Sequence, residues 1–340
     1  MTIKRTITTN KHINILFKGS VYILVCIIII LTTAQSSYSK STIVVIPKAT
    51  LPHYWKIVCT GAHTAIQNTS SELIWRGPRT ENKIGAQVHL MDFYIKKKVD
   101  AIVIAPSHKF KINESIDKAV HAGIKVVVID SQTSTKTIHS FIGTDNFKAG
   151  ALGAKIIVGK IKKKGPVLLM GHVPGSASIE NRVDGFIEEI HKIAPGLSII
   201  RADLIEGAAG EARLVAETII KNTPSIAGIF AVNETTAEGV LHALDKIDIT
   251  IPFVGFDYSQ KLLKGIKDGR IDALITQTPY AIGYMGVKTA LNLIKGKKVP
   301  AIMESPVKVL TLENIDSAQS LRCLQKLSEE LKDKCPMCFN

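Results

Sequence analysis

Beyond residue 40, short apolar runs rich in β-branched residues alternate with longer stretches in which apolar positions recur every three or four residues. Continuous apolar runs are typical of strands buried on both faces, and their alternation with helices indicates parallel sheets covered by helices. The predicted strands are 42–46, 72–75, 101–105, 126–130, 140–143, 167–170, 198–203, 227–232, 252–257, 272–277 and 307–311.

The predicted helices fall into two successive series, each suited to one doubly wound sheet. A chain of 340 residues is long enough for two domains, and no Pro- or Ser-rich linker separates the series, so we expect the domains to touch. The pattern predicts an α/β protein with two doubly wound parallel-sheet lobes. The predicted helices are 53–68, 82–97, 111–122, 145–161, 178–193, 209–221, 234–246, 259–268 and 279–296.

The first 39 residues have the pattern of a signal peptide. Residues 1–20 carry four basic side chains and no acidic one, residues 21–31 are wholly apolar, and small polar residues follow. This order is typical of an exported protein cleaved after Ser39. An uncleaved membrane anchor over 14–34 is the alternative, and both interpretations take the protein out of the cytoplasm.

The net charge of +14 overstates the charge of the folded part. Without the leader, 39 basic and 29 acidic residues leave +10. The lysine runs at 96–98, 162–164 and 297–298 follow predicted helices, where cations oppose the negative end of the helix dipole. No aromatic residues interleave with them, so we predict no nucleic-acid partner.

The five cysteines give a weak signal. Cys59 lies on an apolar helical face and is expected to be a free core thiol. The other cysteines beyond the leader, Cys323, Cys335 and Cys338, crowd a C-terminal tail over 313–340. A disulfide in an oxidising compartment is favoured there, with a redox pair or an incomplete zinc site as alternatives, and the sequence leaves the pairing open.

Polar and aromatic residues follow five of the predicted strands. Carboxyl ends of parallel strands are where ligands bind in open α/β sheets. Because these residues come from both series, they predict a binding cleft between the two lobes. They are Asp130, Asp257, Asn233, Gln277 and the aromatic pair Tyr54 and Trp55.

The chain carries no G-x-S-x-G, H-E-x-x-H, P-loop or G-x-G-x-x-G motif in a suitable context. Asp130 and Asp257 as an acid–base pair are the enzymatic alternative, which needs one desolvated carboxyl. Polyol binding needs less, because carboxylates and amides accept and donate hydrogen bonds to hydroxyls while aromatic rings cover the apolar C–H face. We therefore predict a receptor for a sugar-like molecule, with no catalytic residue, metal or cofactor.

Several segments together resemble the type I periplasmic sugar-binding proteins, the ribose-binding-protein-like substrate-binding proteins of ABC transporters. The resemblance implies an extracytoplasmic, monomeric receptor in the periplasm that delivers its solute to an ABC transporter permease in the inner membrane. Signalling to a membrane sensor kinase or chemoreceptor is the alternative. The segments are 46–62, 100–109, 122–131, 140–154, 175–186, 226–234, 253–257 and 273–290.

The resemblance also implies three hinge crossovers, near 144–145, 277–278 and 304–307. The N-terminal lobe would then comprise 40–144 and 278–305, and the C-terminal lobe 145–277 and 306–312.

Matching by position implies seven ligand contacts: Tyr54, Trp55, Asp130, Arg182, Asn233, Asp257 and Gln277. Ser131 is an eighth candidate. It departs from the family pattern, because ribose-type members have an arginine at this position. A forked donor is therefore missing, which puts ribose itself in doubt. Structural roles remain open beside these: helix caps for Asp257 and Asn233, a surface ion pair of Arg182 with Asp184 or Glu188, loop orientation for Asp130, and core packing for Tyr54 and Trp55.

Overall fold

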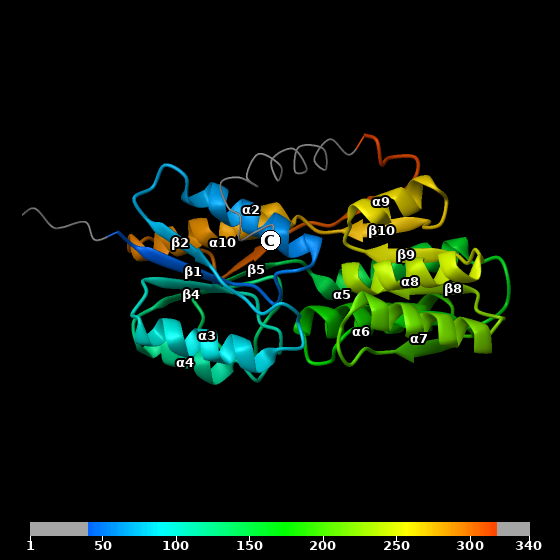
Figure 1. Cartoon of the computed structure of the whole chain (residues 1–340), viewed down its shortest axis with the longest axis horizontal. Helices are drawn as coiled ribbons and strands as arrows, with labels where there is room; N and C mark the ends of the chain where they lie inside the picture. Colours follow the sequence, from blue (N-terminus) through cyan, green and yellow to red (C-terminus); the bar gives the residue numbers. More distant parts are fainter. Residues whose placement is uncertain (1–39, 318–340) are drawn as a thin grey trace, which may run out of the picture. The chain divides into compact units, whose positions relative to one another are not determined.

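The computed structural model describes residues 40–317 and contains two six-stranded sheets. The first sheet is parallel throughout, in the order β11-β5-β4-β3-β1-β2. Helices α2 (His53–Ile66) and α10 (Pro279–Ile294) cover one face, and α3 (Ile84–Lys96) and α4 (Asn113–His121) cover the other (Figure 1). Its strands are β1 (Thr42–Ile46), β2 (Glu72–Trp75), β3 (Ala101–Ile104), β4 (Lys125–Ile129), β5 (Ser140–Gly143) and β11 (Ile302–Glu304).

The second sheet has the order β12-β10-β9-β8-β6-β7. Helix α5 packs against α6 on one face of this sheet, while α7 packs against α8 and α8 against α9. Its strands are β6 (Val167–Met170), β7 (Ile199–Ala202), β8 (Gly228–Ala231), β9 (Phe253–Phe256), β10 (Ala273–Thr276) and β12 (Lys308–Leu310). Its helices are α5 (Asn146–Lys160), α6 (Ala177–Ile193), α7 (Ala209–Asn222), α8 (Glu234–Ile247) and α9 (Gln260–Lys267).

The predicted fold class is confirmed, with two differences at the sheet edges. Strand β11 was not predicted, because its three residues are largely exposed and form no apolar run. Strand β12 runs antiparallel to β10, with Leu310 opposite Leu274. Only 305–307 separates β12 from β11 of the first sheet, so the chain enters β12 at the end of the second sheet where β10 leaves it, and the two strands run in opposite directions.

The chain passes between the two sheets three times within the described residues. The passages lie between β5 and α5, between β10 and α10, and between β11 and β12. Their use as hinges, and the domain boundaries placed at them, stay predictions.

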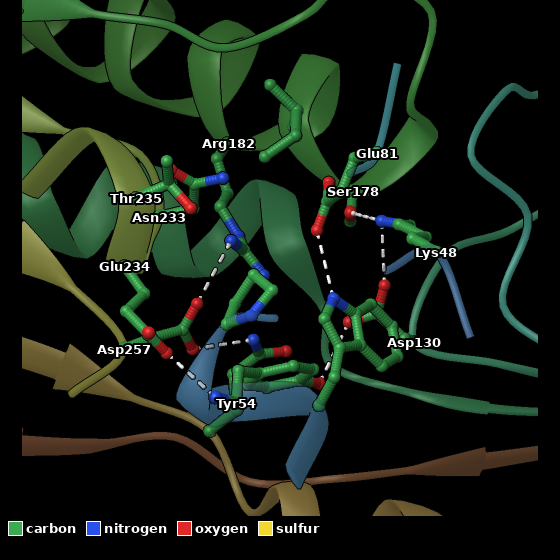
Figure 2. A pocket seen from close by; sticks show the side chains of 14 residues that line it. Lys48, Tyr54, Glu81, Asp130, Ser178, Arg182, Asn233, Glu234, Thr235 and Asp257 are labelled. Atoms are coloured by element: carbon green, nitrogen blue, oxygen red, sulfur yellow. Dashed lines mark hydrogen bonds and ion pairs between the residues drawn. The ribbon is translucent and has the colours of Figure 1, made fainter. Parts of the chain in front are cut away.

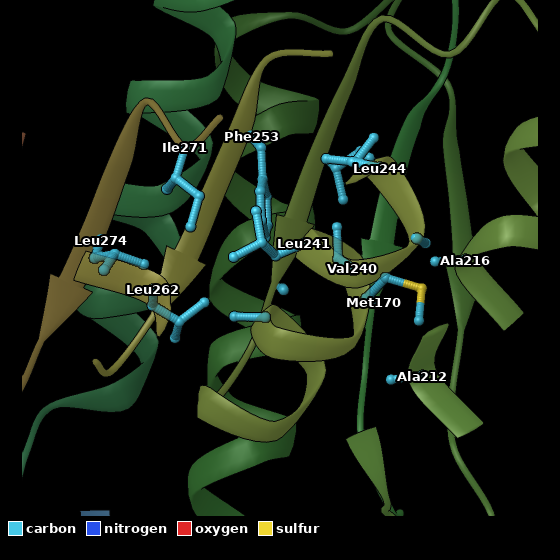
Figure 3. Close-up of a cluster of buried hydrophobic side chains, with 14 of the residues drawn as sticks. Met170, Ala212, Ala216, Val240, Leu241, Leu244, Phe253, Leu262, Ile271 and Leu274 are labelled. Carbon is cyan, nitrogen blue, oxygen red and sulfur yellow. The ribbon is translucent and has the colours of Figure 1, made fainter. Parts of the chain in front are cut away.

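The continuous apolar runs are explained by helices on both faces of each sheet. Ile43 and Val45 of β1 enter the cluster beneath α2 and α10, whereas Val44 and Ile46 enter the cluster beneath α3 and α4. The second lobe repeats this alternation, and Figure 3 shows Met170 of β6 beside Val240 and Ala216. The inner strands therefore bury side chains on both sides, which leaves their ends as the place for polar residues.

Two predictions concern residues that the structure does not describe, and a third is contradicted by it. The leader and the tail cysteines lie outside 40–317. Cys59 is buried in the first-lobe core, but it is disulfide-bonded, so the expected free thiol is wrong. Within 40–317, no helix is both long and apolar enough to span a membrane.

A close glycine contact sets the position of α6 against α5. A Cβ added at Gly150 of α5 would lie 2.0 Å from the carbonyl oxygen of Arg182. Because that atom is backbone, it cannot move away without shifting the helix. The spacing of the two helices therefore controls where the Arg182 side chain begins.

We expect Gly150→Ala to destabilise the protein by about 1–3 kcal/mol through overpacking. Gly159→Ala on the same helix is the matched control, because nothing lies within 4 Å of an added Cβ there. That control should be neutral or stabilising by up to about 1 kcal/mol, since alanine favours helix. Urea unfolding of both variants measures the difference, and equal midpoints would contradict the close-contact argument.

Candidate ligand-binding site

The two strand-end aspartates share an unusual backbone conformation. Asp130 follows β4 with φ of 63°, and Asp257 follows β9 with φ of 65°. Residues other than glycine rarely adopt this left-handed region, and such strain gathers at functional sites. Each amide donates to the neighbouring strand at 2.8 Å, Asp130 to the Ile142 carbonyl and Asp257 to the Ile275 carbonyl. The same strand-end turn therefore presents a carboxylate in each lobe.

Asp130 has a partner at each carboxylate oxygen. The Tyr54 hydroxyl donates to Oδ1 at 2.8 Å, and Lys48 Nζ lies 2.7 Å from Oδ2 in a buried ion pair. Burial, chiefly, and the neighbouring Asp130 charge raise the pKa of Tyr54 well above its usual value, so its hydroxyl keeps the proton it donates. Asp130 lines the pocket and also holds the side chains of Lys48 and Tyr54 in place. The structural role that the sequence left open for Asp130 is therefore combined with a place at the pocket.

Asp257 is only partly neutralised. Gln277 Nε2 donates to Oδ1 at 2.9 Å, while Arg182 Nη1 lies 3.9 Å from Oδ2. Burial raises the pKa of Asp257 to about 6, although Arg182 and Gln277 act in the opposite direction. The N-cap of α9 is Ser259 instead, so the capping alternative for Asp257 is wrong.

Arg182 is buried and points away from Asp184 and Glu188. Its Nε donates to Asn146 Oδ1 at 2.7 Å, and its Nη1 donates to the Val232 carbonyl at 2.8 Å. The guanidinium carbon lies 3.7 Å from the centre of the Phe256 ring, where a cation is attracted to the aromatic face. These contacts fix the guanidinium beside Asp257, which a surface ion pair would not do.

Asn233 and Glu234 lie at the start of α8. Asn233 caps α8 itself, whereas Glu234 caps α2 of the first lobe. Asn233 Oδ1 accepts the Thr236 amide at 3.0 Å, so the structural alternative for Asn233, a helix cap, is confirmed. Glu234 reaches the first lobe, where its carboxylate accepts the amides of His53 at 2.8 Å and Tyr54 at 2.7 Å. Burial raises the pKa of Glu234 to about 8 in spite of these two donors. A second-lobe side chain thus caps a first-lobe helix.

These side chains surround one narrow pocket with a cavity volume of about 20 Å³. Figure 2 shows the side chains converging from elements of both sheets. Seven of the eight predicted residues line it: Tyr54, Trp55, Asp130, Arg182, Asn233, Asp257 and Gln277. Ser131 does not, because its buried hydroxyl accepts the Ser178 amide at 3.1 Å.

Five charged or polar lining residues were not predicted. They are Lys48, Glu81, Ser178, Glu234 and Thr235. Lys48 follows the first strand as the other candidates follow theirs, so its position was a usable signal. Glu81 accepts the indole N–H of Trp55 at 3.0 Å, a contact between a loop and the first turn of α2 that sequence spacing does not reveal. Among the described residues, no group of His, Cys, Asp and Glu could hold a metal ion.

A wider pocket with a cavity volume of about 380 Å³ adjoins the first. It shares four lining residues with it, Pro52, Glu81, Glu234 and Thr235. The smaller pocket therefore adjoins a larger open space between the lobes.

Two parallel-sheet lobes with one polar pocket between them define a two-lobed solute-binding protein. A model of the periplasmic binding protein domain matches residues 43–298. The chain belongs to this family.

Similar proteins support the assignment. The ribose import binding protein RbsB of Bacillus subtilis is 28% identical over 232 residues, which cover 68% of this chain and 75% of the relative. A carbohydrate transporter solute-binding protein from Agrobacterium radiobacter, solved with D-arabinose, has a TM-score of 0.81 and 30% identity, covering 85% of this chain and 99% of that one. An ABC transporter solute-binding protein from Agrobacterium vitis with bound D-fucose has a TM-score of 0.79 and 32% identity, covering 83% and 99%.

The raised pKa of Asp257 predicts a pH-dependent stability difference from Asp257→Asn. Asp257 has a pKa of about 6 in the folded protein against a usual value of 3.8, so protonation of Asp257 favours the folded state. The resulting contribution to the free energy of unfolding is fully present below pH 4 and is lost as pH rises through 6. The loss approaches about 3 kcal/mol. We expect the asparagine variant to gain stability over the wild type toward pH 8, measured by urea unfolding from pH 4 to 8. A difference that stays constant with pH would contradict the buried-carboxylate argument.

Proposed function

We propose that the protein is an extracytoplasmic receptor that binds a sugar or sugar-like molecule between its lobes and delivers it to an ABC importer. The N-terminal segment would export it to the periplasm, and an inner-membrane permease would be its partner. The ligands bound by the two Agrobacterium proteins, D-arabinose and D-fucose, support a monosaccharide-sized polyol.

The observation that carries the proposal is a buried acceptor that lacks a donor. Gln277 Oε1 has no hydrogen-bond partner among the described residues, and Asp257 Oδ2 has Arg182 only at 3.9 Å. Leaving such a group unpaired costs about 1–3 kcal/mol, which a ligand donor would recover. Adjacent sugar hydroxyls can donate to both oxygens, so a polyol satisfies what the protein leaves unsatisfied.

The surrounding groups suit the rest of a sugar. Tyr54 and Trp55 pack edge to face with ring centres 5.0 Å apart and supply apolar surface for C–H groups. The side-chain nitrogen of Asn233 takes no part in the helix cap, which makes it a donor for a ligand oxygen. We propose these residues with Asp130, Arg182, Asp257 and Gln277 as the ligand site, and assign Ser131 a supporting role behind it.

Differential binding would drive closure. The proposed ligand contacts come from both lobes, so a ligand makes all of them only when the lobes are together. It can shift the equilibrium toward that arrangement only by its extra affinity for it. Water-filled and ligand-filled forms would then differ in the surface that the permease meets.

Calorimetric titration with pentoses, hexoses and polyols tests the function. We expect one or more members to bind, and Asp257→Ala to weaken that binding at least tenfold, because a charge-assisted hydrogen bond contributes about 1.5–3 kcal/mol. Asp184→Ala is the matched control, since Asp184 is an exposed carboxylate on α6, and it should leave affinity unchanged. Silence from every sugar in folded protein would refute the sugar-receptor proposal.

A further inference from the structure

Lys48 bridges the two lobes without any ligand. It lies in the loop after β1, in the first lobe, beside Asp130 of the same lobe. Its Nζ donates to Ser176 Oγ at 2.9 Å and to Ser178 Oγ at 2.8 Å, both at the start of α6 in the second lobe. Figure 2 shows the amine between Asp130 and Ser178. Lys48 therefore makes an ion pair within the first lobe and two hydrogen bonds to the second.

Burial makes these contacts matter. Lys48 is 2% exposed, and Ser176 and Ser178 are 3% and 2% exposed. Removing an ammonium from water costs several kcal/mol unless it is paired and hydrogen-bonded. When the lobes separate, Asp130 can stay with Lys48, but both serine hydroxyls leave with the second lobe. The serine contacts therefore belong to the closed arrangement alone.

Two further contacts join the lobes around the pocket. Ser131 Oγ of the first lobe accepts the Ser178 amide at 3.1 Å. Glu234 of the second lobe accepts two amides at the start of α2, and Figure 2 places it on the opposite side of the pocket from Lys48. Protein groups thus hold the lobes on both sides of the space meant for the ligand.

We propose that Lys48 is a positioning residue that clasps the lobes together in the ligand-free protein. Lys48, in the loop after β1, places a cation beside Asp130. Ribose-type members have an arginine at position 131, whereas Ser131 carries no charge. Because the clasp raises the fraction of protein already closed, it raises the apparent affinity for the ligand by the same factor. This last consequence rests on the proposed function, whereas the clasp itself does not.

Small-angle X-ray scattering of the full-length exported protein without ligand tests the clasp. We expect Lys48→Met to have a larger radius of gyration than the wild type, because its methyl end cannot donate to the serines. The double variant Ser176→Ala, Ser178→Ala should expand likewise while keeping the Lys48–Asp130 ion pair. Lys118→Met is the matched control, since Lys118 is an exposed first-lobe lysine on α4, and it should match the wild type.

The outcomes separate clearly. A wild-type radius in both the Lys48 and the double serine variants overturns the clasp, and the serine variant decides the question alone if Lys48→Met fails to fold by circular dichroism. Where a sugar binds the wild type, the serine variant should bind it roughly three- to tenfold more weakly, in line with its smaller closed fraction. If no sugar binds, the proposed function fails while the scattering comparison still decides the clasp.

Discussion

Charged groups buried at the ends of parallel strands are the constraint on which the rest of this structure depends. A carboxylate or ammonium leaves water at a cost of several kcal/mol, so each must find a partner nearby. Asp130 finds Lys48 and Tyr54, and Lys48 in turn finds Ser176 and Ser178. These pairings connect loops, helices and lobes that the backbone alone would leave separate. The pocket is the place where this pairing stays incomplete.

Asp130 and Asp257 share one backbone geometry but have different surroundings. Both have left-handed backbones and donate their amides to the neighbouring strand in the same way. Asp130 has a cation at 2.7 Å, whereas Asp257 has one only at 3.9 Å and a raised pKa. The first carboxylate therefore organises protein, and the second is left with capacity for a ligand. This asymmetry suits the polyol ligand that we propose for the site.

The parallel sheets explain why these residues meet at all. Helices cover both faces of each sheet, so apolar side chains fill the strands and polar ones are confined to the strand ends. Close helix contacts place the pocket residue that α6 carries, because Gly150 allows the backbone of Arg182 to approach α5. Packing in the lobes and chemistry in the pocket are parts of the same arrangement.

The sequence by itself determined the α/β class, the two series of elements and the polar strand ends, because hydrophobic period and strand length are local properties. For that reason the predicted strand-end residues line one pocket, whereas Arg182, on α6, was implied only by the family resemblance. Only tertiary structure decided that Ser131 lies behind the pocket, that Lys48 and Glu234 cross between lobes, and that β12 runs antiparallel. Those contacts join segments far apart in the chain, as Lys48 and Ser178 are. No pattern of neighbouring residues encodes such a distance, because it depends on how two complete lobes pack.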